Sequence, residues 1–400
     1  MKQLPQSFFC LDWGSATVKS FWPINSSFSP FELITNHEGD EFLNSVHFPA
    51  NLTAPEIVKN LEEFYPEPEK EFSGGWVFLS SVQEKFEELK KWWENNSPFK
   101  VIVEEENSKE QFLLQGGGRW RYGDYNFLLI DLGGGKTTLL FSEDKEKHFA
   151  QIPYGVGKGG ALFLLEKATE AQLARWLPFT INYEEIADYF GNKSLFPGQI
   201  PLSKLNLALE QALAREILRS SFSSLAFVGV EKPLRVVLNG MIFSYSPSLS
   251  TVALMFLDGW GREGIQEVYL NPWGSVGLLA QVPFLQDYLK LLGTFVCFRH
   301  CFAAGKIIGR IFLDWGLDEE LEIVLASGDL VRVPLPQGQE CHCRLELAGG
   351  VDLPGFDPDL ILAGGELGLI FDARGRPLER PPAGEKGQEL VRQWQKSLAI

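Results

Sequence analysis

The segment from Phe127 to Phe141 constrains the fold of this chain most strongly, because it joins two apolar runs through a glycine-rich turn. The apolar runs predict two strands, and three consecutive glycines, residues 133–135, stand between them. Glycine has no Cβ, so the backbone can approach a ligand closely, and consecutive N–H groups in such a turn form a concavity suited to phosphate. Asp131, at the end of the first strand, is placed to hold a hydrated Mg²⁺ ion beside that phosphate.

A second copy of this pattern lies near the start of the sequence. Residues 8–11 are apolar, Asp12 and Gly14 follow, and small hydroxyl residues lead into another apolar run that ends at Lys19. Taken alone, one Asp-x-Gly between strands also fits an ordinary hairpin turn. Two such elements, each with an Asp at its turn, favour two related lobes that hold one phosphate chain between them.

The two loops together resemble the phosphate-1 and phosphate-2 loops of the actin-like ATPase superfamily. Its members include sugar kinases, actin, the heat-shock chaperone ATPases and the FtsA and PilM proteins. No Gly-x-x-x-x-Gly-Lys-Ser/Thr occurs, so the pattern is not a P-loop. The resemblance implies an α/β fold with two ribonuclease H-like lobes, bound ATP and Mg²⁺, and Asp12 and Asp131 as catalytic and metal-holding residues. The residues implied to contact the phosphates are Gly14, Ser15, Ala16, Thr17 and Lys19 in the first loop, and Gly133, Gly134, Gly135, Lys136 and Thr137 in the second.

The rest of the sequence predicts further α/β structure and then a β-rich region. Strands are expected at 18–22, 31–34, 76–79 and 101–104, and helices at 54–64, 83–95 and 204–220. Short apolar runs between Gly, Pro and Asp turns follow from about residue 306. We expect lobe I over residues 1–122, lobe II over 123–305, a small C-terminal β module over 306–380 and a C-terminal helix over 381–400.

Several stretches resemble one family, the glutamate mutase L family, often written MutL and distinct from the mismatch-repair protein of that name. Asn-Lys-Ser-Leu at 192–195 and Asp-Ala-Arg-Gly-Arg-Pro at 372–377 are the more specific matches. The other matching stretches are residues 175–179, 184–189, 210–216, 236–240, 257–260, 264–270 and 364–371. The resemblance implies an ATP-dependent reactivating or chaperone-like factor whose partner is a cobalamin-dependent mutase.

The same resemblance places the adenosine of ATP at the end of the strand 235–238. These ATPases usually carry two adjacent glycines there, whereas this chain has Asn239, Gly240 and Met241. Asn239 and Gly240 are implied to contact the nucleotide, and the bulky Met241 would crowd the adenine. Lys136 is a second departure, because a threonine is more usual after the glycines.

Two further nucleotide contacts are expected outside these loops. Glu216, or its neighbour Arg215, is implied to lie near the ribose, against the alternative of a solvated helix face. Gly157 lies in a glycine-rich stretch that opens a helix, which predicts either an anion site of free N–H groups or a flexible turn.

The composition of the chain limits the kinds of partner that it is expected to bind. The 400 residues carry a net charge of −16 without a basic stripe, so nucleic acid is not an expected partner. No apolar run reaches the roughly 20 residues of a membrane span, and residues 1–7 lack a signal-peptide core, so we expect a cytoplasmic protein. Five cysteines form an odd set, which argues against a disulfide framework. The sequence is compatible with an oligomer.

Two clusters leave alternatives open. Arg374 and Arg376 would bind a phosphate or carboxylate, or else lie solvated in a turn. A second group of residues offers zinc ligands, or else buried reduced cysteines: Cys297, His300, Cys301, Cys341, His342 and Cys343.

Other functions remain open beside the mutase hypothesis. The chain would also suit a nucleotide-switched scaffold or filament protein similar to FtsA and PilM. Met241 motivates a third hypothesis, a degenerate fold that binds no nucleotide. A sugar kinase is the weakest rival, because no catalytic base can be singled out.

Overall fold

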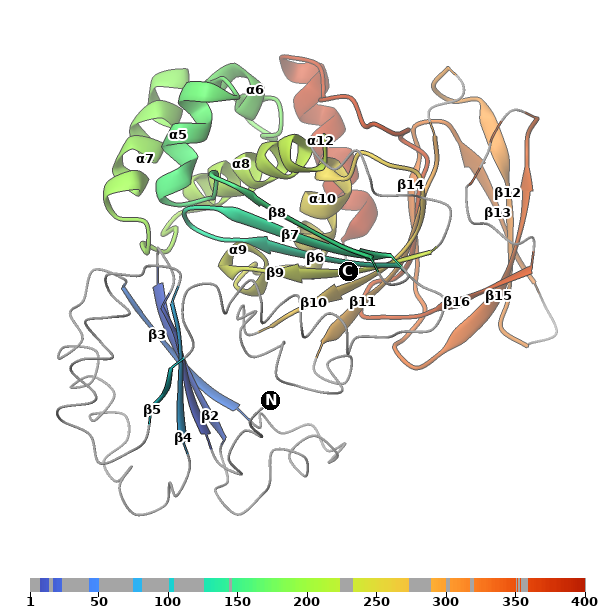
Figure 1. Ribbon diagram of the computed structural model, residues 1–400. Coiled ribbons are helices and arrows are strands. Elements are labelled where there is room, and N and C mark those ends of the chain that lie inside the picture. The colour runs from blue at the N-terminus through green and yellow to red at the C-terminus, as the bar shows by residue number, and fades with distance from the viewer. Residues whose placement is uncertain are drawn as a thin grey trace. The chain divides into compact units, whose positions relative to one another are not determined.

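The computed structural model describes five strands of the N-terminal part and most of the chain from residue 126 onward. The described residues are 8–13, 17–23, 43–49, 75–80, 101–103, 126–143, 146–223, 233–272, 289–299, 303–316, 320–349, 351, 353 and 359–399. The chain divides into two compact units, whose strands and helices are labelled in Figure 1. Unit 1 comprises Met1–Arg121, Phe196–Gln199 and Ser275–Tyr288, and unit 2 comprises Tyr122–Leu195, Ile200–Gly274 and Leu289–Ile400.

Unit 1 contains a five-stranded sheet in the order β3-β2-β1-β4-β5. Its strands are β1 (Phe8–Trp13), β2 (Thr17–Pro23), β3 (Leu43–Pro49), β4 (Gly75–Ser80) and β5 (Val101–Val103). β2 is antiparallel to β1 and β3, whereas β4 is parallel to both β1 and β5. The strands expected at 18–22, 76–79 and 101–104 are therefore present. The strand expected at 31–34 and the helices expected at 54–64 and 83–95 lie outside the described residues.

Unit 2 repeats this strand order within a larger sheet. The repeat consists of β6 (Asn126–Leu132), β7 (Thr137–Glu143), β8 (Glu146–Ile152), β9 (Leu234–Asn239) and β10 (Gly264–Leu270), in the order β8-β7-β6-β9-β10. As in unit 1, the first three strands are antiparallel and the other two are parallel to the first. Three more strands, β11 (Lys290–Cys297), β17 (Gly368–Asp372) and β14 (Leu330–Val333), extend the sheet beyond β10. This order is that of a ribonuclease H-like lobe, and two such lobes in one chain make an actin-like fold.

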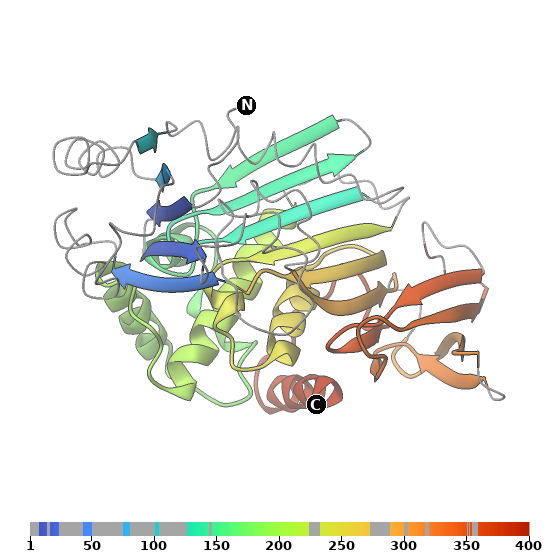
Figure 2. The ribbon, with the colours of Figure 1, turned by 90° about the horizontal axis from the view of Figure 1, so that it is seen from below.

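Helices cover one face of the sheet in unit 2, as Figures 1 and 2 show. They are α5 (Lys158–Glu166), α6 (Glu170–Ala174), α7 (Tyr183–Leu195), α8 (Lys204–Ser223), α9 (Met241–Ser244), α10 (Leu249–Gly259) and α12 (Glu385–Leu398). Every second residue of β6 faces this layer, and α8 buries Leu209, Leu213 and Ile217 at helical spacing against it. Within the described residues, no helix combines the length and the apolar character that crossing a membrane requires.

A second sheet packs on the β11, β17 and β14 end of the large sheet. It contains β13 (Leu321–Ala326), β12 (Ile307–Asp314), β15 (Glu340–Leu347) and β16 (Asp359–Ala363), in that order. Ile311 and Leu345 from the small sheet share a buried core with Val296 and Phe371 from the large one. The region 306–380 is thus β-rich, but it is not a sheet of its own, because β14 and β17 are strands of the large sheet.

The cysteines of this region are buried rather than gathered as metal ligands. Cys341 and Cys343 lie two positions apart on β15 and share its core face, while the exposed His342 lies on the other face. Burial raises the pKa of both thiols, to about 11 for Cys341 and about 12 for Cys343. Among the described residues no three His, Cys, Asp or Glu side chains are grouped to hold a metal. His300 and Cys301 lie outside the described residues.

Candidate nucleotide-binding site

Asp12 and Asp131 occupy the same position in the strand order of their units. Asp12 lies opposite Lys19 in the β1–β2 pair, and Asp131 lies opposite Thr138 in the β6–β7 pair. Each is the next-to-last residue of its strand, and in each unit the neighbouring parallel strand ends at the same edge. Ligands of α/β sheets bind at the carboxyl ends of the strands. Thr17 also lies on β2, whereas Gly14, Ser15 and Ala16 lie outside the described residues.

The triple-glycine turn of unit 2 directs two N–H groups away from the loop that follows β8. The N–H of Val156 donates to the Gly133 carbonyl at 3.0 Å, and the N–H of Gly157 donates to the Gly134 carbonyl at 2.8 Å. The carbonyl and the N–H of a trans peptide point in opposite directions. The N–H groups of Gly134 and Gly135 therefore point away from that loop, and the turn is partly exposed. This arrangement suits an anion.

Gly157 has a supporting role in this geometry. The sequence predicts a free donor at Gly157, but its N–H is bonded to Gly134, and the N–H of Gly159 donates to the same carbonyl at 3.1 Å. The predicted phosphate residue Thr137 is buried, and its hydroxyl donates to the Tyr154 carbonyl at 2.8 Å. Both residues hold the turn against the start of α5 instead of offering these groups to a ligand.

Position 155 requires glycine, because the loop after β8 passes very close to the triple-glycine turn there. A Cβ on Gly155 would lie 2.3 Å from the Gly133 carbonyl oxygen, so the turn would have to move. We expect Gly155→Ala to lower the free energy of unfolding by about 1–3 kcal/mol, as overpacking does, and to weaken ATP binding. Urea unfolding and calorimetric titration measure the two effects.

The matched control is Gly191→Ala in α7, where a Cβ would meet no atom within 4 Å. We expect that change to stabilise the protein by about 0.5–1 kcal/mol, because alanine is the better helix residue. Equal stability of the two variants would contradict the packing of the loop on the turn.

Three polar side chains line up at the ends of neighbouring strands. Asn239 Nδ2 donates to Asp131 Oδ1 at 2.6 Å, and Asn271 Nδ2 donates to Asn239 Oδ1 at 2.5 Å. Asp131 is the next-to-last residue of β6, Asn239 ends β9, and Asn271 directly follows β10. Asn239 is expected to contact the nucleotide, whereas its amide is engaged by these two neighbours. Asn271 was missed, and the only sequence signal for it is a polar residue directly after an apolar strand.

The Asn239–Gly240 turn lies directly against the end of β6. Gly240 has φ +122°, and a Cβ there would come within 2.3 Å of the Leu132 carbonyl oxygen. Met241 follows as the first residue of α9 and is partly exposed. The resemblance implies a second glycine directly after Gly240. This chain has Met241 there, and Met241 begins a short helix.

Glu216 and Arg215 belong to a buried ion-pair network between α8, α10 and the C-terminal segment. Glu216 accepts from Trp176 Nε1 at 2.7 Å and pairs with Arg380 at 2.6 Å. Arg215 pairs with Asp258 at 2.7 Å. The carboxylate expected near the ribose is therefore bonded to these partners.

The same network contains the segment 372–377. Arg374 contacts Asp258 at 2.8 Å and Asp372 at 2.7 Å, and Arg376 contacts Asp372 at 2.6 Å. Burial alone would raise the pKa of Asp372, but the two guanidinium groups outweigh it and lower that pKa to about 2. Both expectations for these arginines, an anion site and a solvated turn, are wrong, because their charges are buried and paired within the chain.

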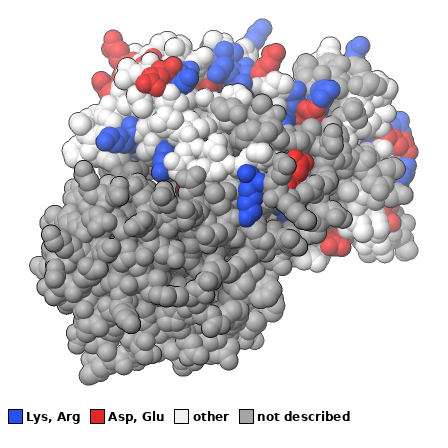
Figure 3. All heavy atoms as spheres, in the orientation of Figure 1, with Lys and Arg blue, Asp and Glu red and all other residues white. Residues whose placement is uncertain are grey.

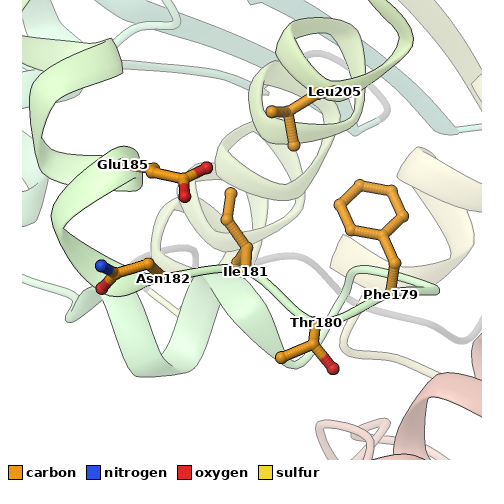
Figure 4. A pocket seen from close by; sticks show the side chains of 6 residues that line it. All are labelled: Phe179, Thr180, Ile181, Asn182, Glu185 and Leu205. Atoms are coloured by element: carbon orange, nitrogen blue, oxygen red, sulfur yellow. The ribbon is translucent and has the colours of Figure 1, made fainter.

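A groove of about 690 Å³ opens on the helical side of unit 2 (Figure 4). It is lined by Phe179, Thr180, Ile181, Asn182, Glu185 and Leu205. None of the residues expected to contact the nucleotide lines it. In the view of Figure 3, acidic and basic side chains are interspersed over the described surface of unit 2.

Comparison with known proteins gives distant similarities only. No protein-family model matches the sequence, and no curated protein matches it. The chain is similar to the ethanolamine utilization protein EutJ from Carboxydothermus hydrogenoformans, with 11% identity, 69% of this chain and 89% of that chain covered, and a TM-score of 0.39. It is similar to a putative N-acetylmannosamine kinase from Listeria monocytogenes, with 14% identity, 70% and 98% covered, and a TM-score of 0.34.

A third similar structure is MreB5 of Spiroplasma citri bound to ADP, with 15% identity, 64% of this chain and 94% of that chain covered, and a TM-score of 0.28. The assignment of the fold rests on strand order, because the order β3-β2-β1-β4-β5 recurs as β8-β7-β6-β9-β10 with an Asp at the same position. The chain has the actin-like fold.

Proposed function

We propose that this chain is an actin-like protein that binds ATP and Mg²⁺ through the strand-end loops of both units. The observation that carries the proposal is the shared position of Asp12 and Asp131, each directly before a glycine-containing turn. Calorimetric titration with ATP, with and without Mg²⁺, tests it. Equal affinity in the two conditions would contradict the magnesium assignment.

The side chains and backbone groups of unit 2 fit this ligand. Asp131 is partly exposed, and carboxylate oxygens suit Mg²⁺, which keeps several of its waters. The N–H groups of Gly134 and Gly135 point away from the neighbouring loop, where an anion can accept from them. A bound Mg²⁺ ion would neutralise phosphate charge.

In this proposal each loop has its own part. Asp12 and Asp131 hold hydrated Mg²⁺. Residues 14–16 of the first loop donate backbone N–H groups to the β-phosphate, with Thr17 and Lys19 nearby. Within residues 133–137, the N–H groups of Gly134 and Gly135 would donate to the γ-phosphate, because the N–H of Gly133 donates to the Lys136 carbonyl inside the turn. Any ATP turnover would be slow.

The proposed cellular role is ATP-dependent reactivation or chaperoning of a cobalamin-dependent mutase. The support is the resemblance of separate stretches to the glutamate mutase L family. Several of these stretches meet inside unit 2: Lys193 pairs with Glu210 at 2.7 Å, and Asp258 joins residues 372–376. These contacts give the matching stretches a structural role in this chain, and the partner needs a test of its own. Glutamate mutase inactivated by turnover should regain activity with this chain and ATP, but not with an Asp131→Ala variant.

The second candidate function is a nucleotide-switched scaffold or filament protein. Large apolar side chains are exposed on the helical segment between β8 and β9, among them Leu165 and Leu202, each with 85% of its surface exposed. Exposed apolar side chains mark contact with another protein surface where they form one patch, so this candidate requires that Leu165 and Leu202 belong to one patch.

This candidate predicts that the chain pellets in the presence of ATP and Mg²⁺. The paired change Leu165→Asp and Leu202→Asp should abolish pelleting, because a charge cannot be buried in an apolar contact without a partner. Val324→Asp, at an exposed apolar position on β13, is the control and should pellet like the wild type. Sedimentation that does not depend on ATP would exclude the switch.

A further inference from the structure

Asn271 completes a chain of side-chain hydrogen bonds that ends at Asp131. It donates to Asn239, which donates to Asp131, across the adjacent strands β10, β9 and β6. Asn271 has 0% of its surface exposed and Asn239 has 1%. Water therefore does not compete for the bond between the two asparagines, and the amide of Asn239 depends on its two neighbours.

The chemistry of the three side chains determines which of them donates and which accepts in each of these hydrogen bonds. An ionised carboxylate only accepts hydrogen bonds, so Asn239 must present its NH₂ group to Asp131. The carbonyl of Asn239 then faces Asn271, which must donate. The two ends of an amide are nearly equal in shape, so the acceptor on Asp131 and the donor on Asn271 together select the orientation of Asn239.

Asn271 is itself held at two backbone positions. Its N–H donates to the Leu238 carbonyl at 2.9 Å, and its carbonyl accepts from Ser244 Oγ at 2.8 Å. Ser244 Oγ also donates to the Gly240 carbonyl at 3.1 Å. Asn271 is thus fixed to the end of β9 and to α9, and it has little freedom to turn away.

We propose that Asn271 is a positioning residue, which keeps Asp131 oriented at the triple-glycine turn by fixing the amide of Asn239. This inference rests on the proposed binding of ATP with Mg²⁺. The expected effect is confined to what the carboxylate of Asp131 contributes. Loss of the donor at 271 should impair the contribution of Mg²⁺ to ATP binding, while nucleotide contacts made by backbone N–H groups persist.

Asn271→Asp tests the inference, because the new side chain has the same shape but only accepts. Asn239 then has one NH₂ group for two carboxylates, so in either orientation two oxygens face each other and the bond that holds Asp131 is lost or weakened. We expect the affinity for ATP in the presence of Mg²⁺ to fall about tenfold or more, and the affinity without Mg²⁺ to stay near that of the wild type. Asn271→Ala removes the donor without adding charge and should give a smaller loss of the same kind.

Asn126→Asp is the matched control. Asn126 is also buried, lies at the opposite end of β6 and donates to Glu143 at 3.1 Å. This variant sets a carboxylate against a carboxylate without touching Asp131, so it should lower thermal stability and keep the Mg²⁺ dependence. If Asn271→Asp does not fold, Asn271→Ala carries the comparison.

The outcomes separate the inference from the proposed function. Absence of Mg²⁺-dependent ATP binding in the wild type would remove the function on which the inference rests. A wild type that binds ATP in a Mg²⁺-dependent way, beside Asn271 variants with the same dependence, would overturn the inference alone. Equal loss in Asn126→Asp and Asn271→Asp would assign Asn271 a general structural role and would also overturn it.

Discussion

Asp131→Asn should abolish the Mg²⁺ dependence of ATP binding while the protein stays folded. The asparagine keeps the shape of the carboxylate and one oxygen that can accept from Asn239, which donates to Asp131 at 2.6 Å in the wild type. It loses the negative charge that would face the hydrated ion. We expect the affinity for ATP with Mg²⁺ to fall about 100-fold or more, which corresponds to about 2.7 kcal/mol.

Calorimetry measures this effect, and circular dichroism verifies the fold. Asp188→Asn on the exposed face of α7 is the control for the loss of one negative charge, and its affinity should not change. If Asp131→Asn binds ATP with Mg²⁺ as tightly as the wild type does, the position of the ion at the end of β6 is wrong.

The second large effect is expected at Asp372, which holds the C-terminal segment to the body of unit 2. Its side chain is fully buried and is bonded by both Arg374 and Arg376. Arg374 also lies over the Trp394 ring of α12, 4.4 Å from its centroid. Asp372→Asn would leave two buried guanidinium groups without their main counter-charge. Breaking a buried pair in this way costs about 3–5 kcal/mol.

Urea unfolding followed by circular dichroism measures this loss. Glu389→Gln, which breaks the exposed Glu389–Arg392 pair, is the control, and it should change stability by less than about 1 kcal/mol. If Asp372→Asn were as stable as this control, the network would not hold the C-terminal segment.

The ion-pair network also predicts in which direction the stability of the folded chain changes with pH. The pKa of Asp372 is lowered from its ordinary value of 3.8 to about 2 in the folded chain. A lowered carboxyl pKa contributes stability that is complete above the unfolded pKa and is lost as pH falls through the folded pKa. The wild type should therefore lose stability between about pH 4 and pH 2, and Asp372→Asn should lack this part of the loss.

The hairpins and their Asp residues could be predicted from the sequence because the signal is local. Apolar runs, a carboxylate and glycines within fifteen residues predict both the strands and the turn, and β6 and β7 lie where the pattern puts them. The order of the strands could be read only from the structure. No local pattern in the sequence indicates that β9 pairs with β6, about a hundred residues away.

The contacts of the candidate site and of the ion-pair network also depend on residues that are far apart in the sequence. Asn271 reaches Asp131 only because β10, β9 and β6 are neighbours, and Arg374 meets Asp258 from 116 residues away. A segment such as Asp-Ala-Arg-Gly-Arg-Pro has the composition of a surface turn, so only the fold reveals that it is buried. The N–H of Gly157 is not the free donor expected of an anion site for a related reason, since its loop folds back on the triple-glycine turn.

The central claim is that this actin-like fold binds ATP with Mg²⁺ at the ends of its strands. The most direct measurement is a calorimetric titration of the wild type with ATP in the presence of Mg²⁺, beside Asp131→Ala. Micromolar binding that is lost in the variant is the predicted result. An absence of binding in the wild type would contradict the claim and would leave a fold in which Met241 or Lys136 has closed the site.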